Sequence, residues 1–270
     1  MTTKSLFLLL AFFILNLANL DAQSSYGDIS FNKAVNMSGR QRMLTQKMSK
    51  NYLLLVKNPN NSNFKTELNE SKALFESQLI TLKKNAPSAS NKSFIEKIDN
   101  LWNTFKGLIE DLPANTKSAK SIMDLNTGLL KACNDLVVDI ESNTSKDLDD
   151  KKKKLLRVIN KSGKQRMLSQ RLALYYTASL VFPENKLAYR NTLNKIFLEY
   201  DDVISFLSIV EFNNDASEKE LGVIMKKWDK YVTDKEGFFS GSFDATEVYT
   251  TTNNLTSCFN KITNIYASIN

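Results

Sequence analysis

Apolar residues recur along most of the chain at the three-to-four-residue spacing that is typical of amphipathic helices. A clear example is the apolar stripe within residues 91–111, formed by Phe94, Ile98, Trp102, Phe105 and Ile109. Each of the four prolines falls between two such segments, where a helix is expected to end. The pattern predicts an all-α protein with helices at residues 28–57, 62–84, 91–111, 117–145, 147–182, 184–210, 216–235 and 242–269.

The chain contains one helical unit twice. Residues 36–47, NMSGRQRMLTQK, return as residues 160–171, NKSGKQRMLSQR, with eight of the twelve positions identical. The only two Trp and the only two Cys of the chain also fall at matching positions, Trp102 with Trp228 and Cys133 with Cys258. A repeat of this length is too long for a solenoid and has the size of a domain. We therefore assign residues 23–145 and 146–270 to two homologous four-helix units.

Short connections predict that consecutive helices run antiparallel, so that each unit forms an up-and-down four-helix bundle. The stretch 139–154 contains neither Gly nor Pro. The last helix of the first unit is therefore predicted to continue directly into the first helix of the second unit. Two homologous units can pack about a pseudo-twofold axis, which would bring their matching helices together.

Composition narrows the range of functions. The chain has no His and only two Cys. Without His, Ser-His-Asp and Cys-His nucleophile chemistry and His-ligated zinc sites are excluded, and two thiols cannot complete a Cys-rich metal site. We therefore expect no catalytic residue, no metal site and no cofactor, and predict that the protein is not an enzyme.

The net charge is +7, from 36 basic and 29 acidic side chains. Its densest basic run, residues 151–154, directly follows Asp149 and Asp150 and is typical of a solvated helix face. No pattern of stacking aromatic residues in a basic groove accompanies this run. We therefore expect no nucleic-acid partner.

The N-terminus has the pattern of a secretory signal peptide. Lys4 precedes an unbroken apolar run at residues 6–15, which at about 10 residues is too short to span a bilayer as a helix. Ala22 offers a small residue for cleavage, so we assign residues 1–22 to the leader. We expect the mature chain to be exported, either periplasmic or secreted, and to contain no transmembrane segment; the alternative is an uncleaved membrane anchor.

The repeated motif concentrates the candidate chemistry. Gly39 and Gly163 each stand inside a predicted helix, where glycine costs about 1 kcal/mol relative to alanine. Their recurrence indicates either a close approach of two helices or close access to a ligand. Ser38 and Arg42 lie one turn apart on one face, as do Ser162 and Arg166 in the second copy. Guanidinium groups and hydroxyls together suit a small oxyanion, while a solvated basic face with a packing glycine is the alternative.

Residues 36–50 and 160–174 resemble the ligand-box helix of a family of bacterial sensory input domains, found in type IV pilus-type methyl-accepting chemotaxis transducers and in nitrate/nitrite sensor kinases. The resemblance rests on the pattern SG[RK]QRML[ST]Q[KR], which occurs twice. It implies an all-α, four-helix sensing module. In the nitrate sensors, one box Arg from each of two subunits holds one anion at the dimer interface, and the matching positions here are Arg42 and Arg166.

We therefore predict an exported sensory-type module that binds a small molecule or anion, with nitrate or nitrite as examples, at the two box helices. The predicted ligand-binding residues are Arg42, Arg166, Arg40, Lys164, Ser38 and Ser162, and the predicted packing glycines are Gly39 and Gly163. Because the mature chain has no predicted membrane span of its own, we expect it either to present its ligand to a membrane-bound signalling protein or to act as an exported scavenger without one. The alternative is a structural or protein-interaction bundle that contacts a membrane receptor or surface partner without a small ligand.

The two cysteines allow two outcomes. An exported protein meets an oxidising environment, so Cys133 and Cys258 could form a disulfide if a pseudo-twofold arrangement places the fourth helices side by side. The alternative is a pair of buried free thiols.

Overall fold

The computed structural model describes residues 25–144 and 149–269, and the predicted signal peptide lies outside them. The first half begins with a two-stranded antiparallel hairpin, β1 (Ser25–Tyr26) and β2 (Ile29–Ser30). Four long helices follow: α2 (Phe31–Lys57), α3 (Ser62–Asn85), α4 (Ala89–Glu110) and α5 (Thr116–Thr144). The all-α class predicted from the sequence is confirmed.

The second half repeats this order with additions. It contains α6 (Asp150–Val181), the 3₁₀ turn η2 (Pro183–Asn185), α7 (Lys186–Leu207), α8 (Asp215–Thr233), the short helix α9 (Lys235–Ser240) and α10 (Ala245–Ala267). The eight long helices begin and end within a few residues of their predicted bounds. Neither the hairpin nor α9 was predicted, because segments of two to six residues carry no measurable apolar period.

Polar side chains set where several helices begin. Ser30, Asn61 and Ser88 each accept a hydrogen bond from the backbone N–H three residues later, at the starts of α2, α3 and α4. Such N-caps satisfy backbone donors that have no partner within the helix. Local sequence therefore accounts for the starts of these three helices.

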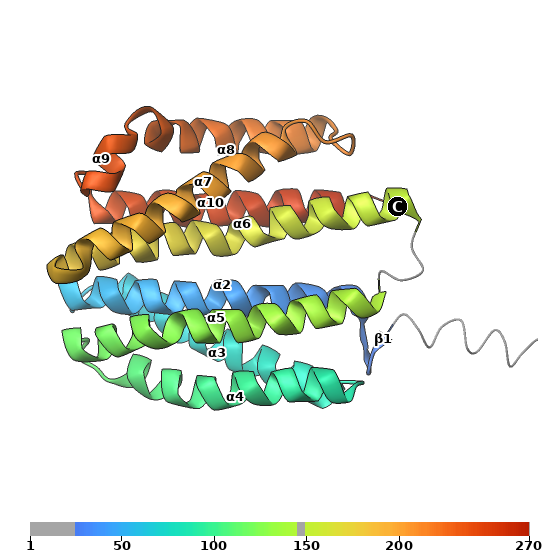
Figure 1. The fold of residues 1–270 in the computed structure, drawn as a ribbon, viewed down its shortest axis with the longest axis horizontal. Helices are drawn as coiled ribbons and strands as arrows, with labels where there is room; N and C mark the ends of the chain where they lie inside the picture. Colours follow the sequence, from blue (N-terminus) through green and yellow to red (C-terminus); the bar gives the residue numbers. More distant parts are fainter. Residues whose placement is uncertain (1–24, 145–148, 270) are drawn as a thin grey trace, which may run out of the picture.

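The prediction of one continuous helix across the junction is wrong. Asp149 has an extended backbone, with φ −66° and ψ 166°, and its side chain caps α6 by accepting from the N–H of Lys152 at 2.8 Å. Figure 1 shows that α5 and α6 run in opposite directions. The absence of Gly and Pro permitted a continuous helix, but a capping Asp begins a new one.

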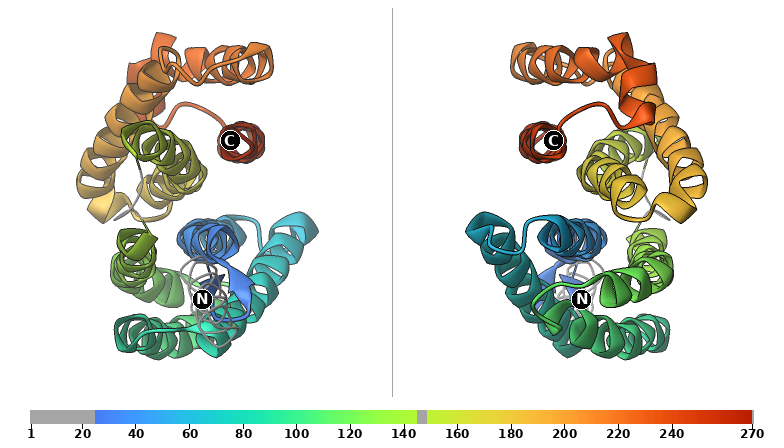
Figure 2. Two further views of the ribbon diagram at one scale, coloured as in Figure 1. Left: turned by 90° about the vertical axis from the view of Figure 1, so that its right-hand side faces the viewer. Right: turned by 90° about the vertical axis from the view of Figure 1, so that its left-hand side faces the viewer.

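Helices α2 and α6 form the contact between the two halves. Within the first half, α2 packs on α3 and α5, and α4 packs on α5; within the second, α6 packs on α7 and α10, and α8 packs on α10. Figure 2 shows the halves end-on, with α2 and α6 adjacent at the centre. Both helices run in the same direction (Figure 1), so the two copies of the repeated motif lie against each other in parallel.

The buried apolar residues of both halves form one continuous core, in which each Trp packs on a Phe of its own half. Trp102 is buried and stacks on Phe75, with ring centroids 4.3 Å apart, and Trp228 is buried beside Phe197 at 4.6 Å. Both Trp residues are therefore core residues, as their apolar stripes predict.

The disulfide alternative does not hold in the structure, where Cys133 and Cys258 are both buried free thiols. Each thiol belongs to the interior of its own half, since Cys133 lies near Arg42 of α2 and Cys258 lies near Tyr200 of α7. Burial raises the pKa of the Cys133 thiol to about 12, which keeps it in the unreactive protonated form.

Candidate functional site

A cavity of about 430 Å³ lies where the N-terminal halves of α2 and α6 meet. Its lining includes both glycines and both arginines of the repeated motif, Gly39, Arg42, Gly163 and Arg166. Residues from the C-terminal parts of α5 and α10 complete the wall. The structure thus brings the two box arginines together from opposite halves of the chain.

The glycines make room for guanidinium groups. A Cβ added at Gly39 would lie 3.5 Å from Nη2 of Arg42 and 3.9 Å from Nη2 of Arg166. A Cβ added at Gly163 would lie 3.3 Å from Nη2 of Arg166, closer than ordinary van der Waals contact. No backbone atom of a neighbouring helix is among these close neighbours. The space beside each glycine therefore holds an arginine head, and Cγ2 of Thr263 on α10 also lies 3.8 Å from a Cβ added at Gly163. A role of the two glycines in helix packing stays a prediction.

Arg166 is held in place by neutral acceptors from both halves. Its Nη1 donates to Oδ1 of Asn36 at 3.2 Å and to Oδ1 of Asn260 at 3.1 Å, and its Nε donates to the carbonyl of Gly163 at 3.1 Å. The side chain is buried. Burial, reinforced by the charges of Arg40 and Arg42, lowers the pKa of Arg166 to about 10. No carboxylate is paired with this charge within the described ranges.

Arg42 is less completely bonded. Its Nη1 donates to Oδ1 of Asn134 at 2.9 Å, while its buried Nε has no hydrogen-bond partner in the described part of the chain. Burial lowers the pKa of Arg42, and the charge of Glu141 opposes this shift. Among the described residues Arg42 also lacks an ion pair within 4 Å. Two cations with unmet capacity for an anion thus face one cavity.

The rest of the cavity lining is mixed. Glu141 of α5 and Asn160 of α6 supply polar groups. Burial raises the pKa of Glu141, and the charge of Arg42 and a hydrogen bond from Asn160 oppose that rise. Apolar walls are formed by Phe31, Val35, Leu156, Ile159 and Ala267.

The other four predicted ligand residues lie outside the cavity lining. Ser38 and Ser162 are buried, and their hydroxyls donate to carbonyls of their own helices, those of Val35 and Ile159. Such local bonds are common for Ser in helices. The structure therefore gives both hydroxyls partners other than a ligand in the cavity.

Arg40 and Lys164 also point elsewhere. Lys164 forms an ion pair with Glu199 and lines a separate groove between α5, α6 and α7. Arg40 is partly exposed and acts on the cavity only through its charge, which lowers the pKa of Arg166.

Part of the repeated motif holds the first helix of each half to the fourth. Gln46 donates to Oδ1 of Asn126 on α5 at 2.7 Å, and its counterpart Gln170 donates to Oδ1 of Asn253 on α10 at 3.0 Å. The bonds from Arg42 to Asn134 and from Arg166 to Asn260 follow the same scheme. Structural bonding therefore accounts for several of the repeated polar residues, and the cavity accounts for the Gly–Arg part.

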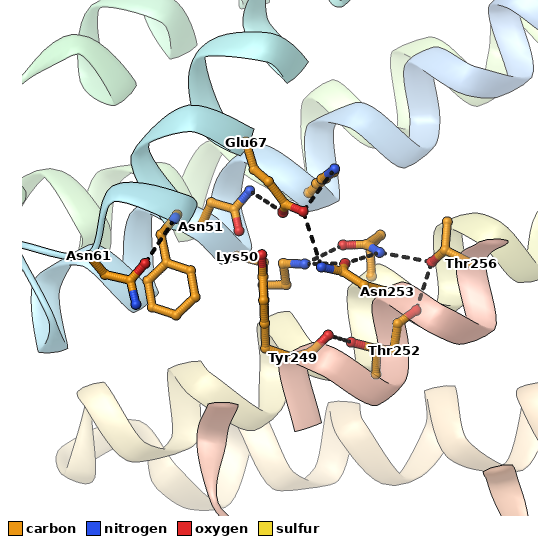
Figure 3. A network of polar contacts seen from close by, with 11 residues as sticks. Lys50, Asn51, Asn61, Glu67, Tyr249, Thr252, Asn253 and Thr256 are labelled. Atoms are coloured by element: carbon orange, nitrogen blue, oxygen red, sulfur yellow. Dashed lines mark hydrogen bonds and ion pairs between the residues drawn. The ribbon is translucent and has the colours of Figure 1, made fainter. Parts of the chain in front are cut away.

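Sequence reasoning missed a second buried basic site at the same interface. Lys50 of α2 is fully buried, and its Nζ donates to Oε1 of Gln170 at 2.6 Å and to Oδ1 of Asn253 at 2.8 Å (Figure 3). The Nζ also lies 4.4 Å from the centroid of the Tyr249 ring. Burial lowers the pKa of Lys50 to about 7, opposed by the charge of Glu67. The sequence does contain a sign of this site: Lys50 stands where the second copy of the motif has the apolar residue Leu174.

Within the described residues, no helix is long and apolar enough to cross a membrane, and no group of three or more acidic or Cys residues could hold a metal ion. The structure thus shows an all-helical fold with a cavity that Arg42 and Arg166 line from α2 and α6. Residues 30–126 match the family model described as type IV pili methyl-accepting chemotaxis transducer N-term. This match confirms the resemblance predicted from the motif at residues 36–50, and the second copy at residues 160–174 lies outside the matched range. No curated protein and no solved structure matched the chain.

Proposed function

We propose that the protein is an exported, non-catalytic sensory module that binds a small anionic ligand in the cavity between α2 and α6. The observation that carries the proposal is the convergence of Arg42 and Arg166 on one cavity without an ion pair among the described residues. A buried charge is costly unless it is paired or hydrogen-bonded. An anion between the two guanidinium groups would supply the missing pairing through charge-assisted hydrogen bonds.

Electrostatics favour a ligand that carries negative charge. The two arginines repel each other, since the charge of Arg42 contributes to the lowered pKa of Arg166. An anion bound between them would turn this repulsion into two attractions. Arginine also offers planar donors that match carboxylate, nitrate or nitrite oxygens.

The sensory role rests on the family match at residues 30–126 and on the duplication. In the resembling nitrate sensors, two subunits each contribute one box arginine, and here one chain supplies both. Because no described helix spans a membrane, we propose that a membrane-bound signalling protein reads the ligand-bound state.

Isothermal titration of the mature protein with nitrate, nitrite and short carboxylates tests the proposal. Arg42→Ala and Arg166→Ala are expected to weaken binding roughly 10- to 100-fold each, as loss of a charged hydrogen bond implies. Arg157→Ala is the matched control, since Arg157 is exposed on the same helix as Arg166. Absence of binding by every anion, with the fold intact, would instead favour a protein-interaction bundle.

A further inference from the structure

The cavity holds an acidic group that a simple anion site would not need. Glu141 of α5 lines the same space as Arg42 and Arg166. It is close enough to Arg42 for each to influence the other's pKa, yet the two form no ion pair within 4 Å. A carboxylate in this position repels a bare anion such as nitrate. Arg42 and Glu141 therefore place a positive and a negative group near each other in the cavity without direct contact.

The size of the cavity and its apolar lining also indicate a ligand larger than a simple anion. The cavity volume of about 430 Å³ falls within the roughly 300–1,000 Å³ of sites for organic ligands, far more than a nitrate ion fills. Apolar side chains, including Val35, Leu156 and Ile159, line part of the wall. A ligand that fills the space should thus have an apolar part besides its charged groups.

We propose, on the basis of the proposed function, that the ligand is a small α-amino acid with an apolar side chain. Its carboxylate would accept hydrogen bonds from Arg42 and Arg166, and its ammonium group would face Glu141. An α-amino acid carries its two charges on groups bonded to the same carbon atom, which matches an arginine and a carboxylate that stand close without touching. Its side chain would lie against the apolar wall.

Other ligand classes leave part of the cavity uncompensated. A dicarboxylate would bring a second negative charge towards Glu141, and an amine without a carboxylate would leave both arginines unpaired. A zwitterion alone satisfies all three charged side chains, and each added pairing favours binding.

Matched pairs of probes that differ only in the amino group test this inference. Alanine is compared with propionate, valine with 3-methylbutanoate and leucine with 4-methylpentanoate, by isothermal titration of the mature protein, with leucinamide and nitrate as further probes. At least one amino acid is expected to bind about 10-fold or more tightly than its deaminated partner. Leucinamide, which lacks the carboxylate, is expected to bind weakest.

Glu141→Gln supplies the second arm of the test, and Glu96→Gln, at an exposed position, is its control. The substitution at Glu141 is expected to remove the preference for the amino acid over its deaminated partner, because it weakens binding of the ammonium group and no longer repels the deaminated carboxylate, which should bind at least as tightly as to the wild type. Carboxylates or nitrate that bind as tightly as the amino acids, or a preference unchanged by Glu141→Gln, would overturn this inference and leave the anion site standing. Binding of none of the probes would overturn both.

Discussion

Two buried basic sites share the α2–α6 interface, and they are completed in different ways. In the C-terminal half of α2, the Nζ of Lys50 is surrounded by protein groups. It donates to two side-chain oxygens within 2.8 Å and lies over the face of an aromatic ring. At the N-terminal end, Arg42 and Arg166 use part of their donors on asparagine oxygens and face a cavity with the rest. One cation has its full set of partners, and the other two do not.

We infer from this difference that Lys50 has a structural role and that the arginine cavity is the proposed binding site. Lys50 joins helices of both halves, because its partners Gln170 and Asn253 belong to α6 and α10. Removing it should therefore change stability. Under the proposed function, the arginines contribute less to stability and more to ligand binding, because their donors without a protein partner face the cavity. The predictions below test this contrast.

The largest effect is expected at Lys50. Lys50→Ala removes a fully buried side chain, leaves Oε1 of Gln170 without a donor, and leaves Oδ1 of Asn253 with only the bond from Nε2 of Gln170. We expect the free energy of unfolding to fall by about 3 kcal/mol, measured by urea denaturation. Lys65→Ala, at an exposed position of α3, is the control and should change stability by less than about 0.5 kcal/mol. A loss below about 1 kcal/mol for Lys50→Ala would contradict the structural role.

The double variant Arg42→Ala/Arg166→Ala should chiefly lose the stabilisation that the ligand provides, in contrast to Lys50→Ala. An amino acid such as leucine, if it is the ligand, stabilises the wild type by about 2.7 kcal/mol at 100 times its Kd. The double variant should lose this ligand-dependent gain entirely. Thermal unfolding with and without leucine measures it, and Arg157→Ala should retain the gain. Retention of the gain in the double variant would place ligand binding elsewhere.

The lowered pKa of Lys50 should also make the free energy of unfolding depend on pH. Its pKa is lowered to about 7 in the folded protein, chiefly by burial, against 10.5 as the ordinary value. Between these values the unfolded chain binds more protons than the folded one, so stability should rise with pH, by up to about 1.4 kcal/mol per pH unit. Below pH 7 both states are protonated and this contribution to the slope vanishes.

Lys50→Met, which keeps the apolar stem without the amine, should lack this rise between pH 7 and 9. The nearby charged groups are Glu67 and Lys47. Burial disfavours ionisation of Glu67, but the charges of Lys50 and Lys47 keep its pKa lowered, so it stays ionised across the window. Equal slopes for wild type and Lys50→Met would show that Lys50 does not titrate there.

The sequence predicts the helices well because their signals are local. Apolar spacing, prolines and capping residues act within a few residues of each helix end. The junction was mispredicted because a capping Asp149 outweighs the absence of Gly and Pro nearby. The packing of α2 on α6 followed only from the duplication, which is a property of the whole chain.

The candidate site was predictable only where it repeats. Arg42 and Arg166 stand out because the same motif occurs twice. Glu141 and Lys50 have no such marker, and their significance depends on which helices pack around them. The local bonds of Ser38 and Ser162 show the converse: their hydroxyls recur in the motif, yet each is used by its own helix backbone.

The smallest effect concerns the glycines and separates the cavity from the helix that carries it. Gly128→Ala in α5 adds a Cβ with no atom within 4 Å, so it should stabilise the protein by up to about 1 kcal/mol through helix propensity. Gly163→Ala gains the same propensity, but its Cβ would lie 3.3 Å from Nη2 of Arg166 and displace that group. For Gly163→Ala we therefore expect a smaller increase in the free energy of unfolding, measured by urea denaturation, and a several-fold loss of ligand affinity. Gly128→Ala should bind the ligand like the wild type. If Gly163→Ala bound the ligand with wild-type affinity, the position of the Arg166 guanidinium beside Gly163 would not matter for ligand binding. The arginines would then have a structural role, as Lys50 does.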